Sequence, residues 1–157
     1  MADLMSALGR PQTRRGRVLM FVSAFSGEGV STMAREYARC EAAFAKRPVW
    51  LVDADLGRQS QMAAVTGEAH RFGPPGTLAS ASPDGSVFFR LAPPGRDGGG
   101  HEIPDHKFLV ARPCLDSRLW VTRFRAKNLA PGQRPRINDH TTYWDSLRKH
   151  AQTLVVD

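Results

Sequence analysis

The sequence predicts an α/β fold built around a mainly parallel sheet, and three observations support this. Residues 18–22 form an apolar, partly β-branched run, which is followed by a loop of small residues and then by a helical pattern. Two further apolar runs, 49–53 and 153–157, have the composition of strands buried on both faces, as does the first. A strand, a crossover helix and a second strand form a βαβ unit, which is parallel and right-handed.

Composition fits a single domain with a short N-terminal extension. The 157 residues are 41% hydrophobic, and no apolar run approaches the length that crosses a bilayer. We expect residues 1–17 to be a flexible basic tail and residues 18–157 to be the domain. The N-terminus has no apolar stretch of signal-peptide length, so we expect a cytoplasmic protein. Cys40 and Cys114 give neither a disulfide framework nor a metal-binding spacing.

The net charge of +7 is concentrated in two zones. Residues 1–17 contain four Arg and one Asp, and residues 118–150 contain eight Lys or Arg and two Asp. Such zones attract nucleic acid, anionic lipid or an acidic partner, or they form a solubilising tail and a solvated face. We favour the solvated face and do not expect nucleic acid as a partner, because no aromatic residues alternate with the cations as base stacking requires.

The first helix is predicted over residues 30–46. Met33, Tyr37, Cys40 and Phe44 recur at steps of four, three and four, which places them on one helix face. Pro48 ends the helix. The remaining pattern predicts, in order, a short helix at 59–65, a loop at 70–83, a strand at 86–91, a flexible loop at 93–104, strands at 108–111 and 118–124, a loop at 128–138 and a helix at 141–150.

The loop after the first strand follows most of the phosphate-binding P-loop pattern. That pattern is Gly or Ala, four residues, then Gly-Lys-Ser/Thr, and Ala24, Gly29 and Ser31 occupy their positions. Its glycines let backbone N–H groups turn towards phosphate at a helix N-terminus. The Lys position holds Val30, which has neither a donor nor a charge. The loop therefore predicts a nucleotide site that is weakened or lost.

Acidic residues end two of the predicted strands. Asp53 and Asp55 follow the second strand, and Asp157 follows the last one. Ligands of open parallel sheets bind beyond the carboxyl ends of the strands, so these acids and the loop are expected to share one edge. Acids at a strand end can also be simply solvated. We favour a functional origin, because two acids that close a strand after a P-loop-like βαβ unit form a specific context.

Three segments together resemble one family. SAFSGEGVST (23–32), WLVDADLGRQS (50–60) and YWDSLRKHAQTLVVD (143–157) resemble the Walker A, Walker A′ and Walker B motifs of bacterial tyrosine kinases. These kinases belong to the ParA/MinD-type P-loop ATPases and act in capsule and exopolysaccharide biosynthesis. The resemblance covers both ends of the chain and leaves 61–117 poorly matched. It implies a three-layer P-loop NTPase-like fold with a mainly parallel sheet, C-terminally incomplete.

The resemblance also implies ATP and Mg²⁺ as cofactors. Asp53 would be catalytic, near the metal and the attacking group, with Asp55 supporting it. Mg²⁺ would be held by the Ser31 hydroxyl, by Asp53 and, through water, by Asp157; oxygen ligands with retained waters suit this ion. The residues at the nucleotide-binding positions are Gly27, Glu28, Gly29, Val30, Ser31 and Thr32.

The chain departs from the family pattern in its cations and in its tyrosines. Besides Val30 at the P-loop Lys position, the signature Lys of many relatives is absent, since Phe25 and Ser26 stand there. Loss of the P-loop Lys should cost several kcal/mol of transition-state stabilisation, roughly the effect of other electrostatic donors. Arg35 and Arg58 are candidate replacements only through their closeness in sequence. The C-terminal tyrosine cluster is missing, which leaves Tyr37 and Tyr143.

The expected function is that of a kinase-like, regulatory P-loop protein of exopolysaccharide or capsule biosynthesis, a pseudokinase with weak or lost ATPase and tyrosine kinase activity. The resemblance implies docking onto a membrane polysaccharide chain-length regulator at the inner face of the membrane. One alternative is an active ATP-dependent tyrosine autokinase or ATPase that replaces the missing Lys. Another is a ParA-like nucleic-acid-binding protein. Whether the chain is an enzyme stays open at this point.

The sequence stops at Asp157, before the Asp-x-x-Pro continuation and the later strands of related folds. We therefore expect part of the sheet to be uncovered and an apolar edge to be exposed. Such an edge invites pairing with another chain. This predicts a domain that is marginally stable or that depends on self-association or a partner.

Overall fold

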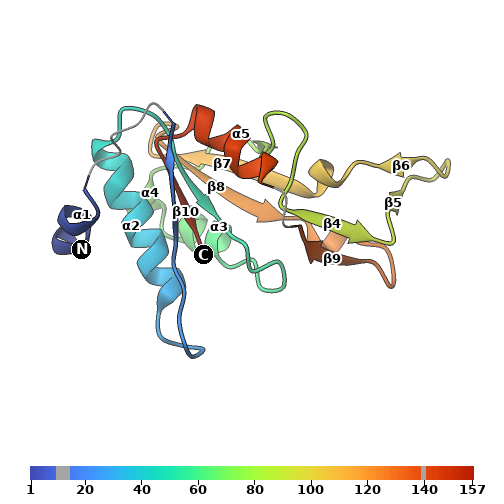
Figure 1. The fold of residues 1–157 in the computed structure, drawn as a ribbon, viewed down its shortest axis with the longest axis horizontal. Coiled ribbons are helices and arrows are strands. Elements are labelled where there is room, and N and C mark those ends of the chain that lie inside the picture. Colours follow the sequence, from blue (N-terminus) through green and yellow to red (C-terminus); the bar gives the residue numbers. More distant parts are fainter. Residues whose placement is uncertain (10–14, 139–140) are drawn as a thin grey trace.

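A six-stranded sheet organises the computed structural model, which describes residues 1–9, 15–138 and 141–157 (Figure 1). The strand order is β1-β10-β2-β8-β7-β3. β1, β10, β2 and β8 are parallel, whereas β7 runs antiparallel to β8 and β3 antiparallel to β7. The predicted α/β fold with a mostly parallel sheet is thereby confirmed. The strands are β1 (Arg17–Met20), β2 (Val49–Val52), β3 (Ala79–Ser80), β7 (Leu109–Cys114), β8 (Leu119–Phe124) and β10 (Thr153–Val156).

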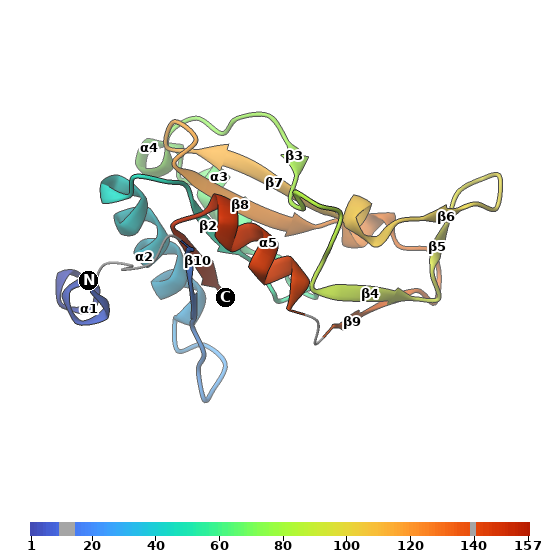
Figure 2. The same cartoon turned by 45° about the horizontal axis from the view of Figure 1, so that its top comes forward.

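Helices flank the sheet on both faces, as Figures 1 and 2 show for α2 and α5. Alternate residues of a strand point to opposite faces, so Leu51 and Val155 pack on the α2 side while Trp50 and Leu154 pack on the α5 side. Within the described ranges, no helix is long and apolar enough to cross a membrane. The helices are α1 (Ala2–Leu8), α2 (Val30–Phe44), α3 (Gln61–Gly67), α4 (Ala69–Phe72) and α5 (Thr142–His150).

A two-stranded sheet and a hairpin extend from the central sheet as an arm (Figure 1). The edge-to-face contact of Phe89 with Phe124, with ring centroids 5.0 Å apart, joins the base of the arm to the end of β8. The arm contains β4 (Phe89–Ala92) paired with β9 (Arg134–Ile137), β5 (Gly95–Arg96) paired with β6 (Glu102–Ile103), and the 3₁₀ turns η1 (Asp105–Phe108) and η2 (Ala126–Asn128).

Predicted elements with strong apolar periodicity are confirmed, and those without it are partly wrong. The helices expected at 30–46 and 141–150 and the strands expected at 49–53, 118–124 and 153–157 lie within two residues of their observed bounds. The loops predicted at 70–83, 93–104 and 128–138 contain α4 and β3, the β5–β6 hairpin and β9. β9 has the sequence RPRI and becomes a strand because it pairs with β4, a tertiary interaction that outweighs its low strand propensity.

The described part of the segment predicted as an N-terminal tail contains a helix and the first residue of β1. Residues 2–8 form α1, whose Leu4 and Met5 pack against the core on the α2 side, and Arg17 begins β1. The Arg17 guanidinium donates to the carbonyls of Leu8 and Gly9 at 2.8 and 2.7 Å. The apolar face of α1 and this arginine hold the segment to the domain; residues 10–14 of the predicted tail lie outside the described residues.

The first strand is not buried on both faces, so the prediction that residues 18–22 form such a strand is wrong. Leu19 packs on the α2 side, but Val18, Met20 and Val22 are 39%, 65% and 75% exposed. β1 has β10 on one side and no strand on the other among the described residues. By contrast, β10 is buried along its whole length between β1 and β2, as predicted. The exposed apolar edge therefore lies on β1.

A buried polar network ties β1, α2 and β10 together around Glu41. The Glu41 carboxylate accepts the Thr153 hydroxyl at 2.9 Å and pairs with the Arg17 guanidinium at 3.3 Å. Arg17 also donates to the Tyr37 hydroxyl at 2.7 Å. Burial first, and then the charge of Glu41, raises the pKa of Tyr37 to about 12. Because Glu41 is 7% exposed, its charge depends on these partners for compensation.

We predict that Glu41→Ala lowers the free energy of unfolding by about 2–4 kcal/mol, because it leaves a half-buried guanidinium and a buried hydroxyl without their acceptor. Urea denaturation of the purified chain measures the change. Glu102→Ala is the control, since Glu102 is exposed on β6 and should change stability by less than about 0.5 kcal/mol. Equal stabilities of the two variants would contradict the proposed role of the network.

Candidate functional site

Two of the predicted acids meet where β2 and β10 end. The strands are parallel and in register, with Val52 opposite Val156, so Asp53 and Asp157 follow them at the same edge of the sheet. The Asp157 amide donates to the Val52 carbonyl at 3.0 Å, and the Ala54 amide donates to the Asp157 carbonyl at 2.9 Å. The Asp53 amide donates to the buried Thr122 hydroxyl of β8 at 3.0 Å. Backbone pairing thus fixes both acids.

Gln61, the first residue of α3, connects these acids to the start of α2. Its amide N–H donates to Asp53 Oδ2 at 3.0 Å, and its side-chain Nε2 donates to Asp157 Oδ2 and, at 2.9 Å, to the Ser31 carbonyl. Gln61 is fully buried, so these bonds are shielded from water. Gln61 therefore brings together three predicted site residues, although Ser31 takes part through its carbonyl and not through the hydroxyl expected to bind Mg²⁺.

Asp53 is a buried acid with an unfilled bonding position. It is 1% exposed, and its Oδ1 has no hydrogen-bond partner among the described atoms. Burial raises the pKa of Asp53 to about 6; the amide of Gln61 opposes this rise, and the charges of Asp157 and Asp55 add to it. Near neutral pH, Asp53 can therefore hold a proton or, once it has lost the proton, bind a cation.

Asp55 lies near this pair but does not join it. It is exposed, and its Oδ1 accepts the amides of Gly57 and Arg58, both at 3.1 Å. This side-chain-to-backbone bonding stabilises the turn that follows β2. Its predicted catalytic role stays a prediction, and the structure gives it a structural one.

The loop between β1 and α2 projects beyond the end of the sheet (Figure 1). Gly27 and Gly29 have φ of 91° and 79°, the left-handed region that favours glycine, and Gly29 precedes the first turn of α2. Two backbone donors of the loop are occupied from within, because Glu28 Oε2 accepts the amides of Ala24 and Phe25 at 3.1 and 3.3 Å. A carboxylate thus occupies donors that could otherwise meet an anion.

The acids fit a cation better than the loop fits a nucleotide. The orphaned, buried Oδ1 of Asp53 beside Asp157 is a hard oxygen donor of the kind that Mg²⁺ accepts. The loop is less suited to a triphosphate, because the Glu28 side chain is negatively charged and the Val30 side chain has no hydrogen-bond donor. Thr32, the last residue assigned to the nucleotide, is exposed on the first turn of α2. No set of three His, Cys, Asp or Glu side chains that could hold a metal occurs in the described part of the chain.

Neither candidate replacement for the missing Lys is placed to act in the loop. Arg35 is engaged with other residues, and Arg58 lines a cavity that no residue of the loop lines. The Arg35 guanidinium donates to Gln61 Oε1 at 3.2 Å and lies 3.9 Å from Glu68. Arg35 thus bonds the side-chain oxygen of Gln61, whose side-chain nitrogen bonds Asp157. Arg58 lies in the turn after β2 and lines a separate cavity with other cations. The structure therefore brings Arg35, but not Arg58, into the network of Asp53 and Asp157.

Gln61 is the site residue that sequence reasoning missed. A glutamine at the start of a short helix carries no motif, and its importance appears only when β2, β10 and α2 are in place.

Comparison with family models found no match, and neither the curated proteins nor the solved structures contain a significant match to this chain. The geometry of the site and the motif resemblance therefore carry the functional argument.

We predict that Asp53→Asn stabilises the protein at neutral pH. An acid whose pKa is raised on folding holds its proton in the native state while the unfolded state loses it. The wild-type free energy of unfolding should therefore fall as pH rises from about 4 to about 6, by about 2–3 kcal/mol in total, and Asp53→Asn should remove this decline. Denaturant titrations across this pH range measure both effects.

The control for this comparison is Asp116→Asn, which removes a carboxyl group from an exposed turn. The difference between the two variants isolates the contribution of Asp53. An Asp53→Asn variant that keeps the wild-type pH dependence, or that is less stable than wild type at neutral pH, would show that Asp53 is charged and compensated in the native state.

Proposed function

We propose that this chain is a P-loop-like regulatory protein of exopolysaccharide or capsule biosynthesis with weak or lost ATPase and tyrosine kinase activity. It would act by binding a membrane polysaccharide chain-length regulator, and this partner would hold it at the inner face of the membrane. The three motif-like segments support the family, and the order of β1, α2, β2 and β10 around one sheet edge is compatible with it. The proposed loss of activity is supported chiefly by the Glu28 carboxylate, which occupies backbone amides of the β1–α2 loop.

The loop lacks the positive charge that phosphoryl transfer requires. Catalysis of this reaction depends on positioned cations and N–H donors around the phosphate oxygens. In this loop Glu28 takes the amides of Ala24 and Phe25, and Val30 replaces the Lys. A nucleotide would have to displace a carboxylate and would gain no cation in exchange.

The tyrosines are also unsuited to autophosphorylation. Tyr37 and Tyr143 are both fully buried. The Tyr37 hydroxyl is hydrogen-bonded to Arg17, and the Tyr143 hydroxyl donates to the Ala81 carbonyl at 3.3 Å. Burial raises the pKa of Tyr143 far above its ordinary value. Neither hydroxyl can reach a phosphate donor while the domain stays folded, so neither tyrosine is a site of autophosphorylation in this fold.

We predict weak binding of ATP·Mg²⁺ and no measurable hydrolysis. Isothermal titration with ATP and Mg²⁺, together with a phosphate-release assay, tests this proposal, and Asp53→Ala is the variant that identifies turnover from this site. Micromolar or tighter affinity, with turnover that Asp53→Ala abolishes, would show an active enzyme and would contradict the proposal.

We predict that Val30→Lys alone strengthens ATP binding by about 1–3 kcal/mol, the scale of charge-assisted hydrogen bonds. Glu28→Gln/Val30→Lys should bind more tightly still, because it also removes the competing carboxylate. Met33→Lys is the matched control, since it adds the same charge at an exposed position of the first turn of α2 that is not among the nucleotide-binding positions. If all three variants bind ATP equally, the loop geometry, and not its charge, limits binding.

We predict that the β1 edge mediates self-association. Edge strands with exposed apolar side chains pair with other chains, and Val18 and Met20 present such a surface. Met20→Lys should shift the chain towards the monomer in sedimentation velocity at micromolar concentrations, with little change in thermal stability. Phe44→Lys is the control, because Phe44 is 75% exposed at the end of α2, away from this edge. A wild-type chain that is monomeric and melts cooperatively like an ordinary domain would contradict this prediction.

A further inference from the structure

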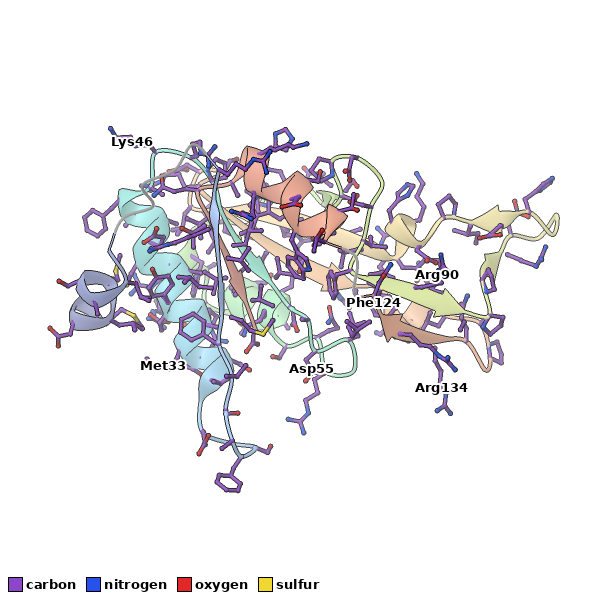
Figure 3. The ribbon with its side chains drawn as sticks, viewed as in Figure 1. Met33, Lys46, Asp55, Arg90, Phe124 and Arg134 are labelled. Carbon is purple, nitrogen blue, oxygen red and sulfur yellow. The ribbon has the colours of Figure 1, made fainter. Side chains whose placement is uncertain are left out.

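Two adjoining cavities lie where β8 ends and β7 begins, separate from the acids and the β1–α2 loop. One, of about 440 Å³, lies between the turn after β2 and the residues that follow β8. The other, of about 630 Å³, continues past η1 towards residues 82–85. The two share Leu78, Val110 and Arg125, so they adjoin one another, and we call them together the basic groove. Phe124, at the end of β8, marks its position in Figure 3.

The charge of the groove has one sign. Its cations are Arg58, Arg123, Arg125 and Lys127 in the smaller cavity and Lys107 in the larger one. None of the described residues lining either cavity is Asp or Glu, and none of these five cations pairs with a carboxylate in the described part of the chain. Cations gathered around a hollow without counter-charges focus a positive potential inside it.

The backbone holds these cations in place. Arg123 is on β8 opposite Val110, and the Arg125 amide donates to the Phe108 carbonyl at 2.7 Å. Gln59 ties the turn that carries Arg58 to β8, since its Oε1 accepts the Phe124 amide. Guanidinium groups on such anchored positions suit the oxygens of a phosphate.

The larger cavity adds an unsatisfied polar group. Ser82 is 7% exposed, and its hydroxyl oxygen is buried without a hydrogen-bond partner among the described atoms. Buried hydroxyls are usually paired, so this one points to a ligand group or water that completes it. The groove therefore offers most of its cations at one end and, past the apolar side chains of Leu78 and Val110, the Ser82 hydroxyl together with Lys107 at the other.

We propose that the basic groove binds a small phosphorylated molecule. Its phosphate or diphosphate would lie among Arg58, Arg123, Arg125 and Lys127, and an uncharged polar part would reach Ser82. The volumes are those of small-molecule sites. Nucleic acid fits less well, because stacking needs an exposed aromatic face and the groove's aromatic residue, Phe124, is 1% exposed.

This inference does not rest on the proposed function, because no residue of the β1–α2 loop lines the groove. The test is titration of the full chain with inorganic pyrophosphate at low ionic strength. Arg125→Gln/Lys127→Gln should weaken binding about ten-fold or more, a loss equal to about 1.4 kcal/mol. Circular dichroism and thermal melting show that the variant is folded.

The matched control is Arg134→Gln/Arg136→Gln, which removes the same charge from β9 without touching either cavity. Figure 3 shows Arg134 on the projecting two-stranded sheet. The control should change pyrophosphate affinity by less than about two-fold. Equal losses of pyrophosphate affinity in both double variants would show that only the net charge of the protein matters, and they would overturn the proposal.

Three further outcomes would overturn it. The first is a wild-type chain that does not bind pyrophosphate. The second is binding that responds to Glu28→Gln and not to the groove variant, which would place the anion at the loop. The third is a single-stranded oligonucleotide that binds more tightly than pyrophosphate, with a steep salt dependence and equal losses in both double variants, which would indicate a nucleic-acid surface.

Discussion

The in-register pairing of β2 with β10 is the constraint on which the rest of the site depends. It brings the ends of two strands that are distant in sequence side by side, and it buries Asp53 beside Asp157. Burying an acid beside a second acid is costly unless its oxygens find donors. Gln61 supplies donors to both acids and at the same time fixes the start of α2 through the Ser31 carbonyl. The position of the site is thus determined by the packing of the core strands β2 and β10.

The same sheet edge carries two regions of opposite charge. Acids end β2 and β10, whereas Arg123 and Arg125 lie at the end of β8, which pairs with β2 in parallel. Gln59 separates the two regions: its amide donates to the carbonyls of Asp53 and Asp55, and its oxygen accepts the Phe124 amide. One region suits a cation or a proton and the other suits an anion, so the two can be occupied and tested independently.

The sequence predicted what periodicity and strand-end position determine. The βαβ unit, the burial of β10 and the shared edge of Asp53 and Asp157 follow from apolar runs in a parallel sheet. The exposure of Met20 could not be predicted, because it depends on β1 being the outer strand. Gln61 and the groove cations could not be found either, because they belong to no motif and come together only when separate elements pack. Glu28 was assigned to the nucleotide by position, whereas its carboxylate occupies the loop's own amides.

The central claim is that Asp53 is a buried acid beside a loop that no longer recruits a nucleotide. The most direct test is an NMR titration of the Asp53 carboxyl carbon, with and without ATP and Mg²⁺. The account predicts a pKa of about 6 for Asp53 in the free protein, and the same pKa in millimolar ATP·Mg²⁺ as in millimolar Mg²⁺ alone. A pKa that falls further with ATP·Mg²⁺ than with Mg²⁺ alone would show that the metal–nucleotide complex binds at this edge, and it would contradict the account.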